Sequence, residues 1–127
     1  MKKRMIVERV FRVGVQDWSR RLFDSLIPLP DGTSYNGYIV TGSEKRAVID
    51  TADPAKSDVF MSQLADIEKV DYVVSNHAEQ DHSGTIPAVL KKYPEARVIT
   101  TPKGKGMLVD LLCIPEERVK TVEDGET

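Results

Sequence analysis

The residues best suited to metal chemistry lie together in one short segment of the chain. It contains both histidines of the sequence, His77 and His82, with Glu79 and Asp81 between them. A metal ion is bound when several imidazole nitrogens or carboxylate oxygens converge within about 2–2.5 Å of one point. Because alternate residues of an extended loop point to one side, the spacing of His77, Glu79 and Asp81 suits such convergence. The segment therefore predicts a metal site formed by these four side chains.

The alternative is a polar surface loop whose histidines are simply solvated. We favour metal binding, because every histidine of the chain falls within 77–82 together with two carboxylates. Mixed imidazole and carboxylate ligands suit iron and manganese as well as zinc, so the residue types leave the identity of the metal open.

The strands and helices that position this segment can be predicted from the apolar pattern. Apolar runs predict strands at 5–15, 38–40, 47–49, 70–74, 97–100 and 119–122. Helical spacing predicts helices at 55–68, 84–93 and 103–112, and Ser83 is expected to cap the second helix. Residues 17–34 are expected to form an irregular loop, because prolines and Gly32 interrupt any periodicity, and Trp18 is expected to pack on the core.

This order of elements predicts an α/β (α+β) fold with a mixed sheet, because strands alternate with helices in the second half of the chain. In such sheets, functional loops follow the carboxyl ends of the strands. The histidine segment directly follows the strand expected at 70–74, so it lies where this rule places chemistry.

Composition limits the classes of function. The 127 residues fit one compact domain, and a formal net charge of −2 argues against nucleic-acid binding through bulk electrostatics. No apolar run approaches the ~20 residues of a membrane helix, and the first residues lack the apolar segment of a signal peptide. The single cysteine, Cys113, excludes an internal disulfide framework and is expected to be buried and inert. We therefore expect a cytoplasmic protein without a membrane partner.

The segment His77-x-Glu79-x-Asp81-His82-Ser83-Gly84 resembles the metal loop of the metallo-β-lactamase superfamily. Most hydrolases of that superfamily have a histidine where this chain has Glu79, and a glutamate there is similar to the flavodiiron proteins. Other segments resemble the same proteins, namely 17–23, 28–36, 48–51, 101–104 and 122–127.

The resemblance implies half of a metallo-β-lactamase-like αββα sandwich, with a mixed sheet and helices on one face. Residues 1–127 would form the N-terminal half of that domain, without the flavodoxin-like domain. The implied activity is the reduction of dioxygen to water or of nitric oxide to nitrous oxide at a non-haem diiron site. His77 and Glu79 would bind one iron, and Asp81 would bind the other with His82 beside it. Asp50 would orient the loop without binding metal.

Further partners are implied by the same resemblance. The remaining iron ligands are expected in a missing C-terminal half or in a second copy of the chain, so this chain alone is expected to be incomplete and inactive. Electrons would come from FMN in a flavodoxin-like domain and from a rubredoxin-type donor. Because a half-sandwich exposes an apolar sheet face, which monomers rarely tolerate, we expect an oligomer or a complex.

Two other functions stay open at this point. The first is a non-enzymatic sensor module that binds oxygen or metal, which would form a stable oxygen adduct without turnover. The second is a zinc hydrolase of the metallo-β-lactamase superfamily. Glu79 argues against the hydrolase, because those enzymes mostly hold zinc with a histidine there.

Overall fold

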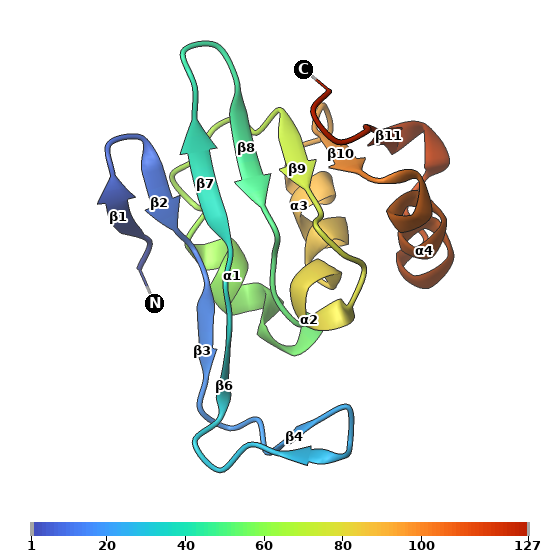
Figure 1. Cartoon of the computed structure of the whole chain (residues 1–127). Helices are drawn as coiled ribbons and strands as arrows, with labels where there is room; N and C mark the ends of the chain where they lie inside the picture. The colour runs from blue at the N-terminus through green and yellow to red at the C-terminus, as the bar shows by residue number, and fades with distance from the viewer. Residues whose placement is uncertain (1, 127) are drawn as a thin grey trace.

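A seven-stranded mixed sheet organises the molecule, and the computed structural model describes residues 2–126 (Figure 1). The strands lie in the order β1 (Arg4–Val7), β2 (Val10–Arg12), β7 (Tyr38–Thr41), β8 (Arg46–Ile49), β9 (Tyr72–Val74), β10 (Arg97–Thr100) and β11 (Val119–Thr121). Neighbours from β1 to β8 are antiparallel, whereas β8, β9, β10 and β11 run parallel. The predicted mixed sheet is therefore confirmed, and its parallel half is the part that alternates with helices.

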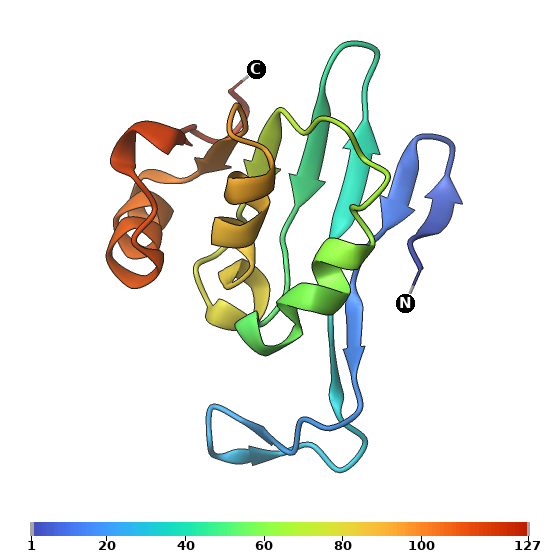
Figure 2. The ribbon, with the colours of Figure 1, turned by 180° about the vertical axis from the view of Figure 1, so that it is seen from behind.

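Helices connect the parallel strands and cover one face of the sheet. They are η1 (Pro54–Lys56), α1 (Ser57–Ser62), α2 (Gln80–Ser83), α3 (Ile86–Lys92), α4 (Pro102–Leu112) and η2 (Glu116–Arg118). In Figure 2, α1 and α3 lie in front of the sheet, and Figure 1 shows the opposite face without a helix over it in the described part of the chain. The expectation of helices on one face is confirmed.

The core is a row of apolar side chains between the sheet and these helices. Strand register aligns one residue from each of six neighbouring strands in this row, namely Phe11, Ile39, Val48, Val73, Val98 and Val119. The helical side contributes four fully buried side chains to the same core, namely Phe60 of α1, Leu64 just after α1, Ile86 of α3 and Leu108 of α4. Burial of this apolar surface is the main force that holds the helices on the sheet.

The other face of the sheet is also apolar but has no helical cover among the described residues. Ile49, Val74 and Ile99 are aligned across β8, β9 and β10 and are only half-buried, and Val40 on β7 is exposed. Successive side chains of a strand point to opposite faces, so this row lies directly behind the core row. The face is called the open face below.

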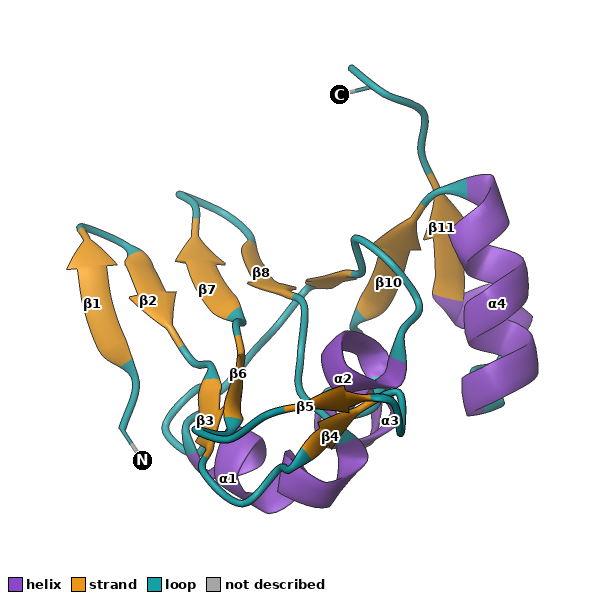
Figure 3. Cartoon of the chain, turned by 60° about the horizontal axis from the view of Figure 1, so that its bottom comes forward, coloured by secondary structure: helices purple, strands orange, loops and turns teal. Residues whose placement is uncertain are grey.

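A two-stranded extension leaves the sheet between β2 and β7. β3 (Val15–Asp17) pairs with β6 (Thr33–Tyr35), and beyond them β4 (Leu22–Phe23) pairs with β5 (Ile27–Pro28). Residues 18–32, called the arm below, run under α2 in Figure 1 and come forward in Figure 3. The irregular loop expected at 17–34 is therefore a short β ribbon. Trp18 is 67% exposed on it, so its expected packing on the core is wrong.

Several element boundaries differ from those expected. The strand expected at 5–15 is split into β1, β2 and β3. Arg9 turns the chain between β1 and β2 with a φ of 67° in the left-handed region, and β3 leaves the main sheet to pair with β6. The first helix ends at Ser62 instead of residue 68, since turns follow it. Ser83 lies inside the short helix α2, and Thr85 occupies the cap position of α3. Cys113 is exposed instead of buried, because it ends α4 with a φ of 52°.

Truncation of Phe60 is expected to cost far more stability than truncation on the open face. Phe60→Ala removes a fully buried ring between helix and sheet, and we expect a loss of about 3–5 kcal/mol in the free energy of unfolding measured with urea. Val40→Ala serves as the control, because Val40 is 39% exposed, and should cost less than about 1 kcal/mol. Equal losses for both variants would contradict this description of the core.

Candidate metal centre

Three of the four expected ligands converge after the carboxyl end of β9. Each of His77, Asp81 and His82 offers one nitrogen or oxygen atom, and these atoms lie within 4.8 Å of one another. The two imidazole rings are 4.7 Å apart between centroids and inclined by 43°. Two ligands of one metal at bond lengths of about 2.0–2.2 Å lie at most about 4.4 Å apart, so small side-chain rotations suffice for coordination.

Glu79 lies beside this group rather than within it. Its Oε2 is 3.8 Å from Nε2 of His77, and its side chain is 63% exposed. Asp81 and His82 are more enclosed, at 20% and 25% exposure, with 3.2 Å between Oδ2 and Nε2. The structure therefore brings together His77, Asp81 and His82, and it places Glu79 next to His77 with freedom to rotate.

The backbone around these side chains is shaped by the start of α2. The amides of His82 and Ser83 both donate to the carbonyl oxygen of Glu79, at 3.0 and 2.8 Å. Glu79 is the last extended residue, and Asp81 lies in the first turn of the helix. The chain thus changes from extended to helical inside the motif. This change brings Asp81 and His82 next to His77, which simple alternation of side chains in a loop does not explain.

Buried hydroxyl groups hold the backbone of this loop in place. Ser75 Oγ donates to the carbonyl oxygen of His77 and Ser83 Oγ to that of Ala78, both at 2.9 Å. The carbonyl oxygen of His82 accepts from the amide of Thr51 at 2.7 Å and from its Oγ1 at 2.8 Å. Each of these hydrogen bonds gives a donor to a backbone carbonyl oxygen that is not paired within a strand of the sheet. The roles of Ser75 and Thr51 were not identified from the sequence, because serine and threonine after strands are common, and Ser83 was expected to act as a helix cap instead.

Close packing under α2 adds a second constraint. A Cβ atom on Gly84 would lie 2.3 Å from Cδ of Pro54 and 2.6 Å from the carbonyl oxygen of Gln80. Thr85 Oγ1 donates to the carbonyl oxygen of Ala52 at 2.9 Å, in the same connection that precedes α1. Only glycine fits at position 84, so the segments after β8 and after β9 approach each other closely.

Asp50 contacts the residue that directly precedes His77. It follows β8 with a φ of 53°, and its two carboxylate oxygens accept hydrogen bonds from Asn76. The Asn76 amide lies 2.9 Å from Oδ1, and Asn76 Nδ2 lies 2.7 Å from Oδ2. The carboxylate thus clamps the backbone at the start of the ligand segment. Asn76 was not identified from the sequence, and no pattern in the sequence marks it.

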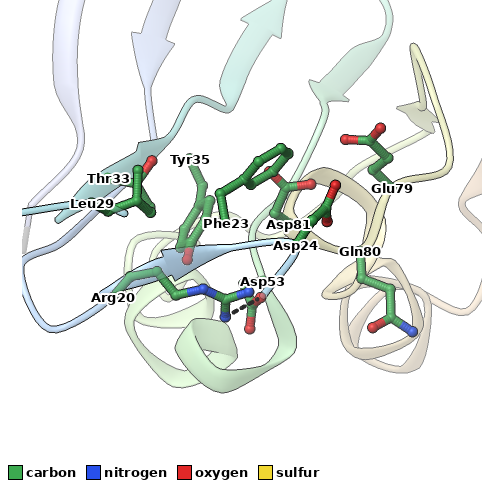
Figure 4. A pocket seen from close by; sticks show the side chains of 10 residues that line it. All are labelled: Arg20, Phe23, Asp24, Leu29, Thr33, Tyr35, Asp53, Glu79, Gln80 and Asp81. Atoms are coloured by element: carbon green, nitrogen blue, oxygen red, sulfur yellow. Dashed lines mark hydrogen bonds and ion pairs between the residues drawn. The ribbon is translucent and has the colours of Figure 1, made fainter. Parts of the chain in front are cut away.

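A pocket of about 240 Å³ lies beside the candidate ligands and is lined on its other side by residues of the arm (Figure 4). Glu79, Gln80 and Asp81 form one wall. The other walls come from the arm and from the segments at its base, and they consist of Arg20, Phe23, Asp24, Leu29, Thr33, Tyr35 and Asp53. The arm therefore forms part of the candidate site.

The arm is anchored by a buried carboxylate at its base. Asp17 Oδ2 accepts from the hydroxyl of Tyr35 at 3.1 Å, and Oδ1 accepts from Ser19 Oγ at 2.9 Å and lies 3.2 Å from Lys56 Nζ. Burial alone would raise the pKa of Asp17, but the hydrogen bonds from Ser19, Lys56 and Tyr35 outweigh it and hold the pKa below its ordinary value. Burial, followed by the hydrogen bond to Asp17, raises the pKa of Tyr35 above its usual range.

A second anchor joins the arm to η1. Arg20 Nη1 lies 3.2 Å from Oδ2 of Asp53, and Figure 4 shows this pair at the edge of the pocket. The other oxygen of Asp53 accepts from the amide of Ala55 at 2.9 Å and caps η1. One carboxylate therefore fixes both the arm and the start of the first helical segment.

Comparison with known protein families shows the superfamily of the chain. Residues 30–125 match the family model described as "Metallo-beta-lactamase superfamily". The chain belongs to this superfamily. The match includes every expected ligand and the whole of the loop after β9.

Relatives of the chain within this superfamily include flavodiiron-type proteins. The chain is 34% identical over 128 residues to a coenzyme F420H(2) oxidase of Methanothermobacter marburgensis, covering 95% of this chain and 31% of that protein. It is 38% identical over 120 residues to the type A flavoprotein fprA of Rhodobacter capsulatus, covering 91% of this chain and 28% of that protein. The chain thus spans about a third of the length of these relatives and matches their metallo-β-lactamase portion.

Solved structures agree with the sequence relatives. The flavodiiron protein of Giardia intestinalis superposes with a TM-score of 0.89 at 27% identity, covering 99% of this chain and 31% of that chain. A subclass B3 metallo-beta-lactamase from a soil metagenome library superposes with a TM-score of 0.74 at 15% identity, covering 99% of this chain and 47% of that chain, and shows the shared fold alone. Among the described residues, no helix is long and apolar enough to cross a membrane.

The Asp17 anchor predicts a specific loss of stability in acid. A carboxylate whose folded pKa is depressed contributes its stabilisation above the ordinary value of 3.8 and loses it as the pH falls through the lower folded value. Asp17→Asn should therefore lower stability at pH 7 and flatten the fall in stability between about pH 5 and pH 2, measured by urea unfolding. Asp31→Asn, at an exposed arm position, is the control and should leave that fall unchanged. A wild-type acid profile for Asp17→Asn would refute the anchor.

Proposed function

We propose that this chain provides metal-binding residues of a flavodiiron-type oxidoreductase that reduces dioxygen to water or nitric oxide to nitrous oxide. The observation that carries the proposal is the convergence of His77, Asp81 and His82, with Glu79 beside them, in a chain whose relatives include an oxidase and proteins named nitric oxide reductase. Glutamate at position 79 supports the flavodiiron type over the zinc hydrolases.

The donor set fits non-haem iron. It combines two imidazoles with two carboxylates and contains no thiolate, which suits ferrous iron. We assign His77 and Glu79 to one iron and Asp81 to the other, with His82 beside Asp81. Bound iron would supply a redox-active centre for a small diatomic substrate. Asp50 and the buried hydroxyls of Ser75, Thr51 and Ser83 would hold the ligands in place.

Four donors are too few for two irons, so the proposal includes a second contributor of ligands. A C-terminal half of the domain or a second copy of the chain would provide them and would cover the open face. Ile49, Val74 and Ile99 are the apolar residues that such a partner would bury. Electrons would come from FMN in a flavodoxin-like domain, supplied in turn by a rubredoxin-type donor. Residues 1–127 alone would then bind metal without completing turnover.

Native mass spectrometry of the chain prepared anaerobically with ferrous iron tests the proposal. We expect iron bound to an assembly larger than one chain, and we expect His77→Ala to abolish the bound iron. Glu95→Gln is the matched control, since Glu95 is exposed and outside the site, and it should retain iron. A monomer without iron would contradict the proposal for this chain, and zinc retention with hydrolysis of a thioester or lactam would favour the hydrolase.

Loss of the Asp50 clamp is expected to weaken metal binding without removing a ligand. Asp50→Ala frees Asn76, so the backbone before His77 is no longer fixed. Residues that orient metal ligands typically contribute 10–100-fold to affinity, and we expect a loss of about that size in ferrous iron affinity measured by competition with a chelator. Circular dichroism should show a folded chain. Unchanged iron affinity in a folded Asp50→Ala variant would contradict the orienting role.

A further inference from the structure

Strand β1 is an exposed edge with an unusual side-chain pattern. It pairs with β2 on one side and has no neighbour on its other side among the described residues. Met5, Ile6 and Val7 are 62%, 52% and 60% exposed, so apolar side chains face solvent on both faces of this strand. Figures 1 and 2 show β1 at the border of the sheet, away from α3 and α4.

The opposite edge of the same sheet shows how an edge is normally protected. On β11, Val119 is buried against the core and the exposed position carries Lys120. A short strand and a charged residue discourage pairing with other chains. β1 is also short and begins with Arg4, but its other three residues are apolar and exposed. The edge at β1 therefore differs from the edge at β11, because only β1 exposes three consecutive large apolar residues.

The edge is held in an extended shape although it buries little apolar surface. Lys3 forms an ion pair with Asp66, and its ammonium lies 5.9 Å from the ring centre of Phe11. The hydrogen bond from Lys3 lowers the pKa of the Asp66 carboxyl. The pairing register of β1 with β2 shifts between Met5 and Val7, so the regular ladder on that side is interrupted at Ile6. An anchored, extended edge loses little conformational freedom when a strand is added.

Charge at this edge distinguishes between possible occupants. In the sequence, Lys2 and Arg4 precede the apolar residues. Arg9 Nε lies 3.9 Å from Glu8 Oε1, so the charges of these two residues offset each other. A second copy aligned along the same edge would bring two basic clusters together, which costs energy at low salt. An acidic strand would instead be attracted, and the apolar side chains of such a strand could cover Met5 and Ile6.

We propose that β1 accepts an extended segment of another polypeptide, in which acidic and apolar residues alternate, as an additional strand of the sheet. Backbone hydrogen bonds along β1 would provide affinity, as in other cases of strand addition. Contacts with Met5, Ile6 and Val7 would bury apolar surface, and Lys2 and Arg4 would select for acidic side chains. The surface lies apart from the metal ligands, so this inference is independent of the proposed reaction.

Binding of a synthetic peptide to the full chain tests the proposal. The probe is a blocked heptapeptide of alternating glutamate and valine, and the reference peptide has lysine in place of each glutamate. We expect the acidic peptide to slow amide hydrogen exchange at 4–7, and we expect fluorescence anisotropy to show that about 0.5 M salt weakens binding. The double variant Lys2→Glu/Arg4→Glu should bind roughly tenfold more weakly, whereas Lys120→Glu on the opposite edge should bind normally.

Three results would overturn the proposal. The first is equal binding of the acidic and basic peptides, which would remove the charge argument. The second is protection of the open-face strands β9 and β10 in place of β1. The third is protection of 4–7 that rises with protein concentration without any peptide, which would identify a second copy as the occupant.

Discussion

The carbonyl oxygen of His82 accepts two hydrogen bonds from Thr51, and the geometry of the candidate site depends on this contact. Thr51 follows β8 and His82 lies in α2 after β9, so the bonds join the two loops at one end of the sheet. The parallel register of β8 and β9 places these loops next to each other. Because Asp50 holds Asn76 in the same region, the segment after β8 fixes the backbone on both sides of the ligands.

The site consequently combines a well-supported backbone with one exposed side chain. His77, Asp81 and His82 are borne on backbone that buried hydroxyls and the Gly84–Pro54 contact hold in place. Glu79 is largely exposed at the rim of the pocket, and the arm that faces it is fixed at its base through Asp17 and Asp53. The pocket side of the candidate site is therefore accessible, while the backbone of three candidate ligands is held in place.

Local sequence patterns predicted the elements whose burial is periodic. The strand at 97–100 and the hairpin of β7 and β8 were found because apolar residues mark them clearly. The split of 5–15 was missed, because Arg9 adopts a left-handed turn that arginine rarely favours. The candidate ligands were expected from their residue types, and three of them converge in the structure. The contacts of Asn76 with Asp50 and of Thr51 with His82 join segments far apart in the sequence, and the bond from Ser83 to Ala78 depends on the turn into α2. Such contacts leave no periodic signal.

The hydroxyl contacts also define what would have to be moved to build this centre into another scaffold. The loop alone would lose its shape, because the partners of its carbonyl groups and of Asn76 lie after β8 and inside α2. Pro54 lies so close that only glycine fits at position 84, and Thr85 Oγ1 donates to the carbonyl oxygen of Ala52. The supporting contacts therefore extend from β8 to β10, because Ser75 donates its amide to Ile99 at 2.9 Å and accepts from Thr100 Oγ1 at 3.0 Å.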